Sequence, residues 1–147
     1  RKVRAMKSKA AKRTRIARVR RIQHDLVAAD AAKAENHASM LESSAERLAA
    51  LRNSLGANMG RASGASLANL GELAMRLDDA RQGLTAAINN ARANATHQSQ
   101  LRLEARQRQE SAAKLEARAA DALAQFIERN SFTSGRRKTR TLAGDNA

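Results

Sequence analysis

Apolar residues recur at intervals of three and four along the first third of the chain. The stripe consists mainly of large aliphatic residues and Ala, and it runs through Ile16, Val19, Ile22, Leu26, Ala34, His37, Leu41, Ala45, Leu48, Leu51 and Leu55. This spacing is typical of one helix that packs on another. It predicts a first helix over about residues 10–55. Around Asp30 and Lys33, where larger apolar residues give way to Ala, we expect close and shallow packing.

A second stripe begins at Leu67 and is longer. Its first series is Leu67, Leu70, Ala74, Leu77, Arg81, Leu84, Ile88, Ala91, Ala95 and Gln98. After one additional step of three it continues as Leu101, Ala105, Arg108, Ala112, Leu115, Ala119, Ala122 and Phe126. The pattern predicts a second helix over about residues 66–129, with a stammer near Gln98 that locally overwinds the coiled coil.

Three glycines, Gly56, Gly60 and Gly64, separate the two stripes. Gly costs about 1 kcal/mol against Ala inside a helix, so this cluster predicts a turn over residues 56–65. A connection this short makes the helices antiparallel neighbours. Pairing residues whose numbers sum to about 121 places Ile16 opposite Ala105 and Met6 opposite Leu115.

The expected fold class is all-α: an elongated two-helix antiparallel coiled-coil hairpin, forming a single domain over residues 1–147. Residues 130–147 read as a disordered basic tail. Composition agrees with long helices, because the chain has no Pro and 85 of its 147 residues are Ala, Glu, Lys, Leu or Arg. Only 28 residues are Leu, Ile, Val, Met or Phe, which is too few for a globular core of normal size.

The surplus charge lies at the two ends of the chain. Residues 1–21 hold eleven Lys or Arg and no acid, and residues 129–147 hold five cations and one acid. In an antiparallel hairpin both basic ends meet at one tip. Arg outnumbers Lys 21 to 7, which favours recognition of carboxylate or phosphate groups. Three partners fit this charge: a nucleic acid, a membrane surface, or an acidic or polar cavity in another protein.

No catalytic constellation is found in the sequence. The three His residues, His24, His37 and His97, are far apart, and the Gly-rich stretch lacks the Lys-Ser/Thr of a phosphate loop. There is no Cys, which excludes disulfides and thiolate metal sites. We therefore expect no catalytic residue, no cofactor and no metal, and a protein that is not an enzyme. No apolar run is long enough to span a membrane, so we expect a cytosolic protein.

Short segments of the chain resemble the flagellar type III export stalk proteins of the FliJ type, which have injectisome relatives of the YscO type. These are coiled-coil hairpins of about this length, with a basic opening such as RIARVRRIQ, a long second helix and a closing segment such as LAQFIERNSF; LDDARQGL is similar as well. The resemblance covers most of residues 13–138.

The resemblance implies a stalk similar to that of rotary ATPases. Its termini would enter the pore of an export ATPase hexamer, its side would contact an export-gate membrane protein, and some family members also handle export chaperones. Such a protein is cytoplasmic and peripherally associated with the inner membrane at the flagellar basal body.

The expected ATPase-ring contacts are cations from both ends: Arg13, Arg15, Arg18, Arg20, Arg21, Arg136, Arg137 and Lys138. The family's gate-binding stripe has spacings of four, three and four, and Leu70, Ala74, Leu77 and Arg81 match it, with Arg81 where the family has a His. The alternative function is that of a basic coiled-coil nucleic-acid-binding protein.

Overall fold

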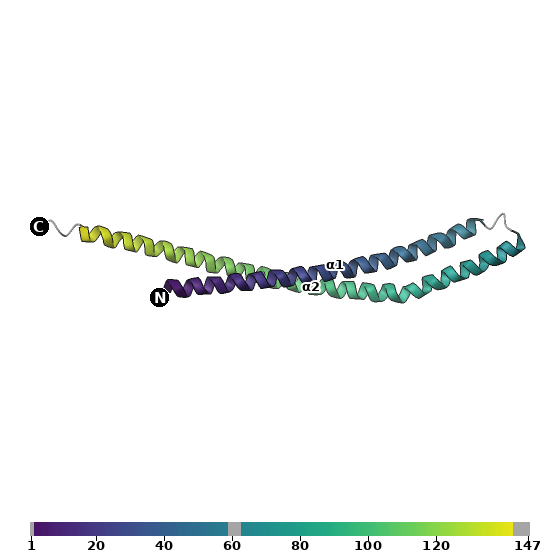
Figure 1. Ribbon diagram of the computed structural model, residues 1–147, viewed down its shortest axis with the longest axis horizontal. Helices are drawn as coiled ribbons and strands as arrows, with labels where there is room; N and C mark the ends of the chain where they lie inside the picture. The colour runs from purple at the N-terminus through teal and green to yellow at the C-terminus, as the bar shows by residue number, and fades with distance from the viewer. Residues whose placement is uncertain (1, 59–62, 143–147) are drawn as a thin grey trace. The chain divides into compact units, whose positions relative to one another are not determined.

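The protein is composed of two long α-helices, α1 (Lys2–Asn58) and α2 (Gly64–Leu142), as the computed structural model in Figure 1 shows. The structure describes residues 2–58 and 63–142, and side chains for 2–57 and 63–132. Ser63 precedes the first turn of α2, where its carbonyl accepts a hydrogen bond from the Leu67 amide at 2.8 Å. No strand occurs in the described residues. The all-α class and the antiparallel packing of two helices are confirmed.

The chain divides into two compact units. The basic unit combines Arg1–Asp25 with Leu103–Ala147, and the hairpin unit is Leu26–Arg102. Each unit therefore contains one segment of α1 and one of α2. In the hairpin unit, Arg52 of α1 pairs with Asp78 of α2, and Glu42 pairs with Arg92. Residue numbers fall along α2 as they rise along α1, which is the antiparallel order.

Where the structure describes side chains, the buried residues of both units are all Ala. They are Ala31, Ala34, Ala38, Ala74, Ala91 and Ala95 in the hairpin unit, and Ala17 and Ala112 in the basic unit. Among the described residues no large side chain is fully buried. A methyl group lets two helix backbones approach closely, but each one removes little apolar area from water. The helix pair is thus closely packed, and its stability is distributed over many small contacts.

Burial along α1 follows an unbroken repeat of seven residues. One series holds Ala at every position except His24: Ala10, Ala17, His24, Ala31, Ala38 and Ala45. The other series is Met6, Arg13, Arg20, Val27, Ala34, Leu41, Leu48 and Leu55. All of these are buried or half-buried, and we call the two series together the α1 seam. This α1 seam confirms the predicted positions Ala34, Leu41, Ala45, Leu48 and Leu55.

Six predicted seam positions of α1 are wrong, because their side chains are exposed: Ile16, Val19, Ile22, Leu26, His37 and Leu51. The cause is helical phase. A straight seam through Leu41, Leu48 and Leu55 continues toward the N-terminus in steps of seven to Val27, Arg20 and Arg13. A helix presents only one face to its neighbour, so the larger apolar residues that are out of phase remain outside.

The register shift predicted near Gln98 in α2 does not persist beyond Leu101. The buried series continues at intervals of seven through Gln98, Ala105, Ala112, Ala119 and Phe126. Of its predicted companions, Leu101 is half-buried as predicted, whereas Arg108, Leu115 and Ala122 are exposed. Their places in the seam are taken by Gln109, Glu116 and Leu123. Polar residues at two of these positions hid the continuous repeat. They are tolerated because the positions are half-buried, which leaves their polar groups access to water.

Both helices extend further than predicted. α1 begins at Lys2, before the predicted residue 10, and α2 continues to Leu142 through the segment predicted to be disordered. α1 also ends at Asn58 and α2 begins at Gly64, so both helices enter the predicted turn over residues 56–65. The outer extensions lack Pro and are rich in strong helix formers or Arg and Lys. The predicted tail residues 143–147 lie outside the described residues.

The stagger of the helices differs from the predicted one. The numbers of Arg52 and Asp78 sum to 130, against the predicted value of about 121. Met6 lines one hollow with Leu115, Ala119 and Ala122, and Ile16 lines another with Ala112 and Leu115. The first residues of α2 are exposed, from Gly64 to Asn69. The stagger therefore differs from the one predicted by assuming the shortest possible turn.

Candidate functional site

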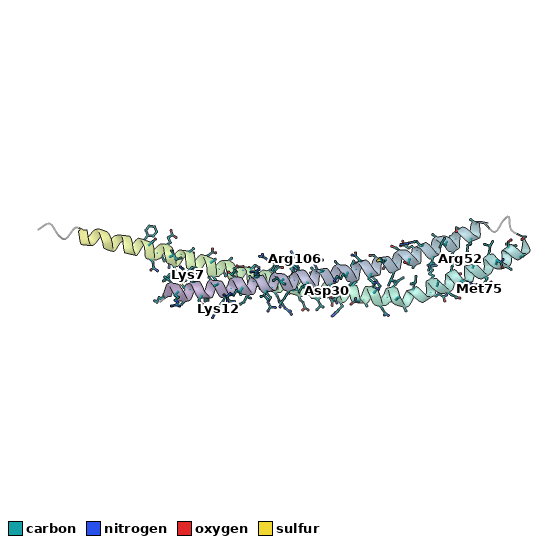
Figure 2. The ribbon with its side chains drawn as sticks, viewed as in Figure 1. Lys7, Lys12, Asp30, Arg52, Met75 and Arg106 are labelled. Atoms are coloured by element: carbon teal, nitrogen blue, oxygen red, sulfur yellow. The ribbon has the colours of Figure 1, made fainter. Side chains whose placement is uncertain are left out.

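The N-terminal part of α1 carries a row of cations without carboxylate partners. Ten of the eleven cations of residues 1–21 lie in the described chain, all on α1, and Figure 2 labels two of them, Lys7 and Lys12. No ion pair within the described residues includes any of the ten. Arg20 donates a hydrogen bond from Nη1 to Gln23 Oε1 at 2.9 Å, a neutral partner. The positive charge of this segment is available to bind another molecule.

Several cations on α2 of the same unit are paired. Arg106 Nε lies 2.9 Å from Glu110 Oε1, and Arg108 Nη2 lies 3.4 Å from Glu104 Oε2. Both pairs join residues four apart on one helix, a spacing that brings side chains together. These acids of α2 therefore pair with cations of their own helix. On α1 no acid precedes Asp25, so the cations there have no such partner.

The predicted ATPase-ring residues fall into three groups. Arg15, Arg18 and Arg21 are exposed on α1, while Arg13 and Arg20 are half-buried in the α1 seam. The remaining three, Arg136, Arg137 and Lys138, belong to α2, and their side chains lie outside the described residues. The five arginines of α1 therefore lie on one helix but on two of its faces.

An exposed apolar stripe accompanies these cations. Ile16, Val19 and Ile22 are 46%, 52% and 52% exposed, although the sequence pattern predicted them in the seam. Ile16 and Val19 line a shallow hollow on α1 together with Arg15 and Arg20. This part of α1 therefore presents apolar and cationic groups together. Continuing the phase of Leu41, Leu48 and Leu55 toward the N-terminus would have revealed this stripe.

The predicted gate-contact residues lie in the hairpin unit. Leu70 and Leu77 are half-buried and Ala74 is only 5% exposed, so these three occupy the seam of α2. Arg81 is exposed. Nearby, α2 exposes two large apolar residues that the sequence pattern did not single out, Leu73 and Met75; Figure 2 labels Met75.

Arg92 of the hairpin unit joins two acids of α1. Its guanidinium donates from Nε to Glu42 Oε1 at 2.5 Å, from Nη2 to Glu42 Oε2, and from Nη1 to Glu35 Oε1 at 2.6 Å. The hydrogen bonds from Arg92 lower the pKa of Glu42, although desolvation opposes this effect. The hydrogen bonds with Glu42 and Glu35 raise the pKa of Arg92. This network links the two helices and fixes their local stagger.

The remaining chemistry is sparse. The described residues contain no group of three His, Asp or Glu side chains that could hold a metal ion. His24 Nδ1 lies 3.2 Å from its neighbour Asp25 Oδ1, and His37 and His97 are exposed. In the described ranges, neither α1 nor α2 has a stretch long and apolar enough to cross a bilayer. Comparison with protein-family models, curated proteins and solved structures finds no match to this chain.

Proposed function

We propose that this protein is a non-enzymatic coupling protein of the flagellar type III export apparatus. Its basic unit inserts into the export ATPase ring, and its hairpin unit contacts the export gate. One observation carries the proposal: α1 holds ten described cations without carboxylate partners, on one segment of an antiparallel helix pair. The resemblance of RIARVRRIQ and LAQFIERNSF to the FliJ type supports the same function.

The physical basis of ring insertion is charge complementarity. Unpaired guanidinium groups bind carboxylates through paired hydrogen bonds, and Arg holds its charge at every physiological pH. A helix pair with an asymmetric distribution of cations contacts the subunits of a ring unequally. Such contacts can promote ring assembly and bias the ring's catalytic cycle without any catalytic residue on the stalk itself. Export chaperones are further partners under this proposal.

The test of ring insertion compares two triple variants of the full chain. One replaces exposed cations of the basic unit by Gln, at Arg15, Arg18 and Arg21. The control removes the same charge from exposed positions of the hairpin unit, at Lys33, Arg47 and Arg76. We expect the first variant to reduce stimulation of the cognate export ATPase and the control to retain it. Equal stimulation by both variants would contradict ring insertion through the basic unit.

The gate contact is proposed for α2 of the hairpin unit, around Leu70, Ala74, Leu77 and Arg81. Because the first three pack against α1, their replacement disturbs the helix pair as well as any partner. Arg81 is exposed, so Arg81→Glu tests gate binding without that complication. We expect weaker binding to the cytoplasmic domain of the gate protein and unchanged ATPase stimulation. Unchanged gate binding would exclude a role for Arg81.

Nucleic-acid binding is the second candidate function, because the same unpaired cations can neutralise phosphates. A gel shift with duplex DNA at about 150 mM salt distinguishes the two. Tight DNA binding without any effect on ATPase assembly would favour the second candidate. Ring stimulation with weak, strongly salt-dependent DNA binding would favour the export function.

A further inference from the structure

Two hollows lie between α1 and α2 of the basic unit. The first, about 260 Å³ in volume, is lined by Met6, Lys9 and Arg13 of α1 and by Leu115 and Arg118 of α2, among others. The second, about 440 Å³, is lined by residues that include Ile16 and Arg20 of α1 and Arg108, Ser111 and Leu115 of α2. Leu115 belongs to both, and we call the two hollows together the Leu115 groove.

The Leu115 groove has an apolar floor. Met6, Ile16 and Leu115 supply its large side chains, and Leu115 is 40% exposed and Ile16 46% exposed. Ile16 precedes the seam residue Ala17, and Leu115 precedes the seam residue Glu116. Apolar residues beside the seam of a helix pair are the positions against which a further helix packs in a coiled coil of higher order. The floor is thus a strip of apolar surface that the two helices do not bury between themselves.

The rim of the groove is cationic. Lys9, Arg13 and Arg118 border the first hollow, and Arg20 borders the second. None of these four belongs to an ion pair of the described residues, and no Asp or Glu lines either hollow. Arg108 is different, because Glu104 pairs with it at 3.4 Å. When a ligand covers the apolar floor, the groups on either side of its apolar part will lie beside these four cations, which have no acidic partner.

We propose that the Leu115 groove binds an acidic amphipathic α-helix of a partner protein. The apolar stripe of that helix would cover Met6, Ile16 and Leu115, and its Asp or Glu residues would pair with the rim. The groove extends from Met6 to Ile16, about 15 Å at 1.5 Å per residue, which matches about three turns of the bound helix. This is the helix-in-groove mode of recognition, in which apolar residues at every third or fourth position of the bound helix contact the groove.

Other occupants fit the Leu115 groove less well. A second copy of this chain would bring two cationic rims together, which is repulsive. A nucleic acid would place charged phosphates over an apolar floor and leave that floor unfilled. A membrane surface requires apolar groups that project outward, whereas these line hollows between two helices. Only an acidic helix satisfies the floor and the rim together.

A designed peptide provides the test. It has three heptads, with Leu at a and d, Glu at e and g, and Ala elsewhere, and it carries a fluorescent label. Anisotropy is measured with the full chain. Leu115→Glu should weaken binding by about tenfold or more, because it places a carboxylate in the floor. Leu103→Glu is the matched control: it adds the same charge to the same helix at a residue that is 58% exposed and lines neither hollow.

Circular dichroism verifies that both variants remain helical. A second variant, Lys9→Gln with Arg118→Gln, leaves the floor unchanged and should weaken binding by about fivefold while reducing its salt dependence. This variant keeps the test valid if Leu115→Glu disturbs the helix pair.

Three outcomes would overturn the proposal. The peptide could fail to bind, a scrambled peptide of equal composition could bind equally well, or Leu103→Glu could weaken binding as much as Leu115→Glu. Preferential binding of a DNA duplex or of phosphatidylglycerol vesicles, with the same loss on Leu115→Glu, would assign the groove to that ligand instead. The test requires no export ATPase, so its failure is distinguishable from failure of the export function.

Discussion

Arg92 of α2 donates hydrogen bonds from two guanidinium nitrogens to the carboxylate of Glu42 on α1, and its Nε lies 2.5 Å from Glu42 Oε1. The third nitrogen donates to Glu35, two turns away on α1. The buried positions of the described seam hold Ala, and a methyl group defines poorly how far one helix slides along the other. The planar fork of Arg92 contributes to this definition, because sliding one helix along the other would break its hydrogen bonds to both carboxylates.

Replacing Arg92 by Lys should therefore lower the melting temperature. Lys keeps the charge but cannot form the bidentate contact with Glu42 or reach Glu35 with a second nitrogen. Arg76→Lys is the control, because Arg76 pairs only with Glu72 on its own helix. Thermal unfolding followed by circular dichroism should show a larger decrease for Arg92→Lys. Equal decreases would mean that the network across the helices has no special role.

Stability should also decrease in acid through Glu42. Its pKa is lowered in the folded chain by hydrogen bonds from Arg92, against an ordinary value of 4.5. The stabilisation is therefore present above that ordinary value and is lost as pH falls through the folded pKa. Urea unfolding at a series of pH values should show a smaller acid loss for Glu42→Gln than for the wild type. Glu46→Gln, at an exposed position of the same helix, should retain the wild-type loss.

The raised pKa of Arg92 affects stability in the opposite direction of pH from the lowered pKa of Glu42. The stabilisation that it reports is present below the ordinary Arg pKa and would be lost only as pH rises above it. Arg92 therefore stays charged throughout the pH range in which the chain can be studied. The pH dependence that we expect between neutral and acidic conditions comes from Glu42.

The phase of α1 can be tested with two leucines three residues apart. Leu48 is half-buried in the α1 seam, whereas Leu51 is 54% exposed, although the sequence pattern placed both in the seam. Leu48→Asp should lower the free energy of unfolding by about 2 kcal/mol or more, because it puts a charge against α2. Leu51→Asp should change it by about 0.5 kcal/mol or less. Similar losses in urea titrations would contradict the phase described above.

Close approach of the helices makes a further prediction at Ala38, which is completely buried. Ala38→Leu forces the backbones apart and should destabilise the chain by about 1–3 kcal/mol, the usual cost of overpacking. Ala32→Leu makes the same change at an exposed position of α1 and should cost about 0.5 kcal/mol or less. If Ala38→Leu leaves the free energy of unfolding in urea unchanged, the helices are not as closely packed at Ala38 as its complete burial indicates.

Local features of the sequence were sufficient to predict the helices, the break between them and their antiparallel packing. The absence of Pro, the abundance of Ala and the Gly cluster from Gly56 act on the backbone directly, so they do not depend on distant contacts. The excess of cations over residues 1–21 was equally evident in the sequence. What the sequence did not reveal is that the described cations there lack partners, because pairing depends on the neighbouring helix.

The tertiary structure alone decided which face of α1 is buried. Apolar periodicity is ambiguous in a helix rich in Ala, since Ile16, Val19 and Ile22 form a plausible stripe of their own. The series through Ala31 and Ala38 is buried, so the buried face of α1 follows this series and not the stripe of larger apolar residues. That choice exposes Ile16, brings it into a common groove with Leu115, and produces the surface proposed to bind an acidic helix. A neighbour's position cannot be read from one helix, so this surface becomes visible only when both helices are in place.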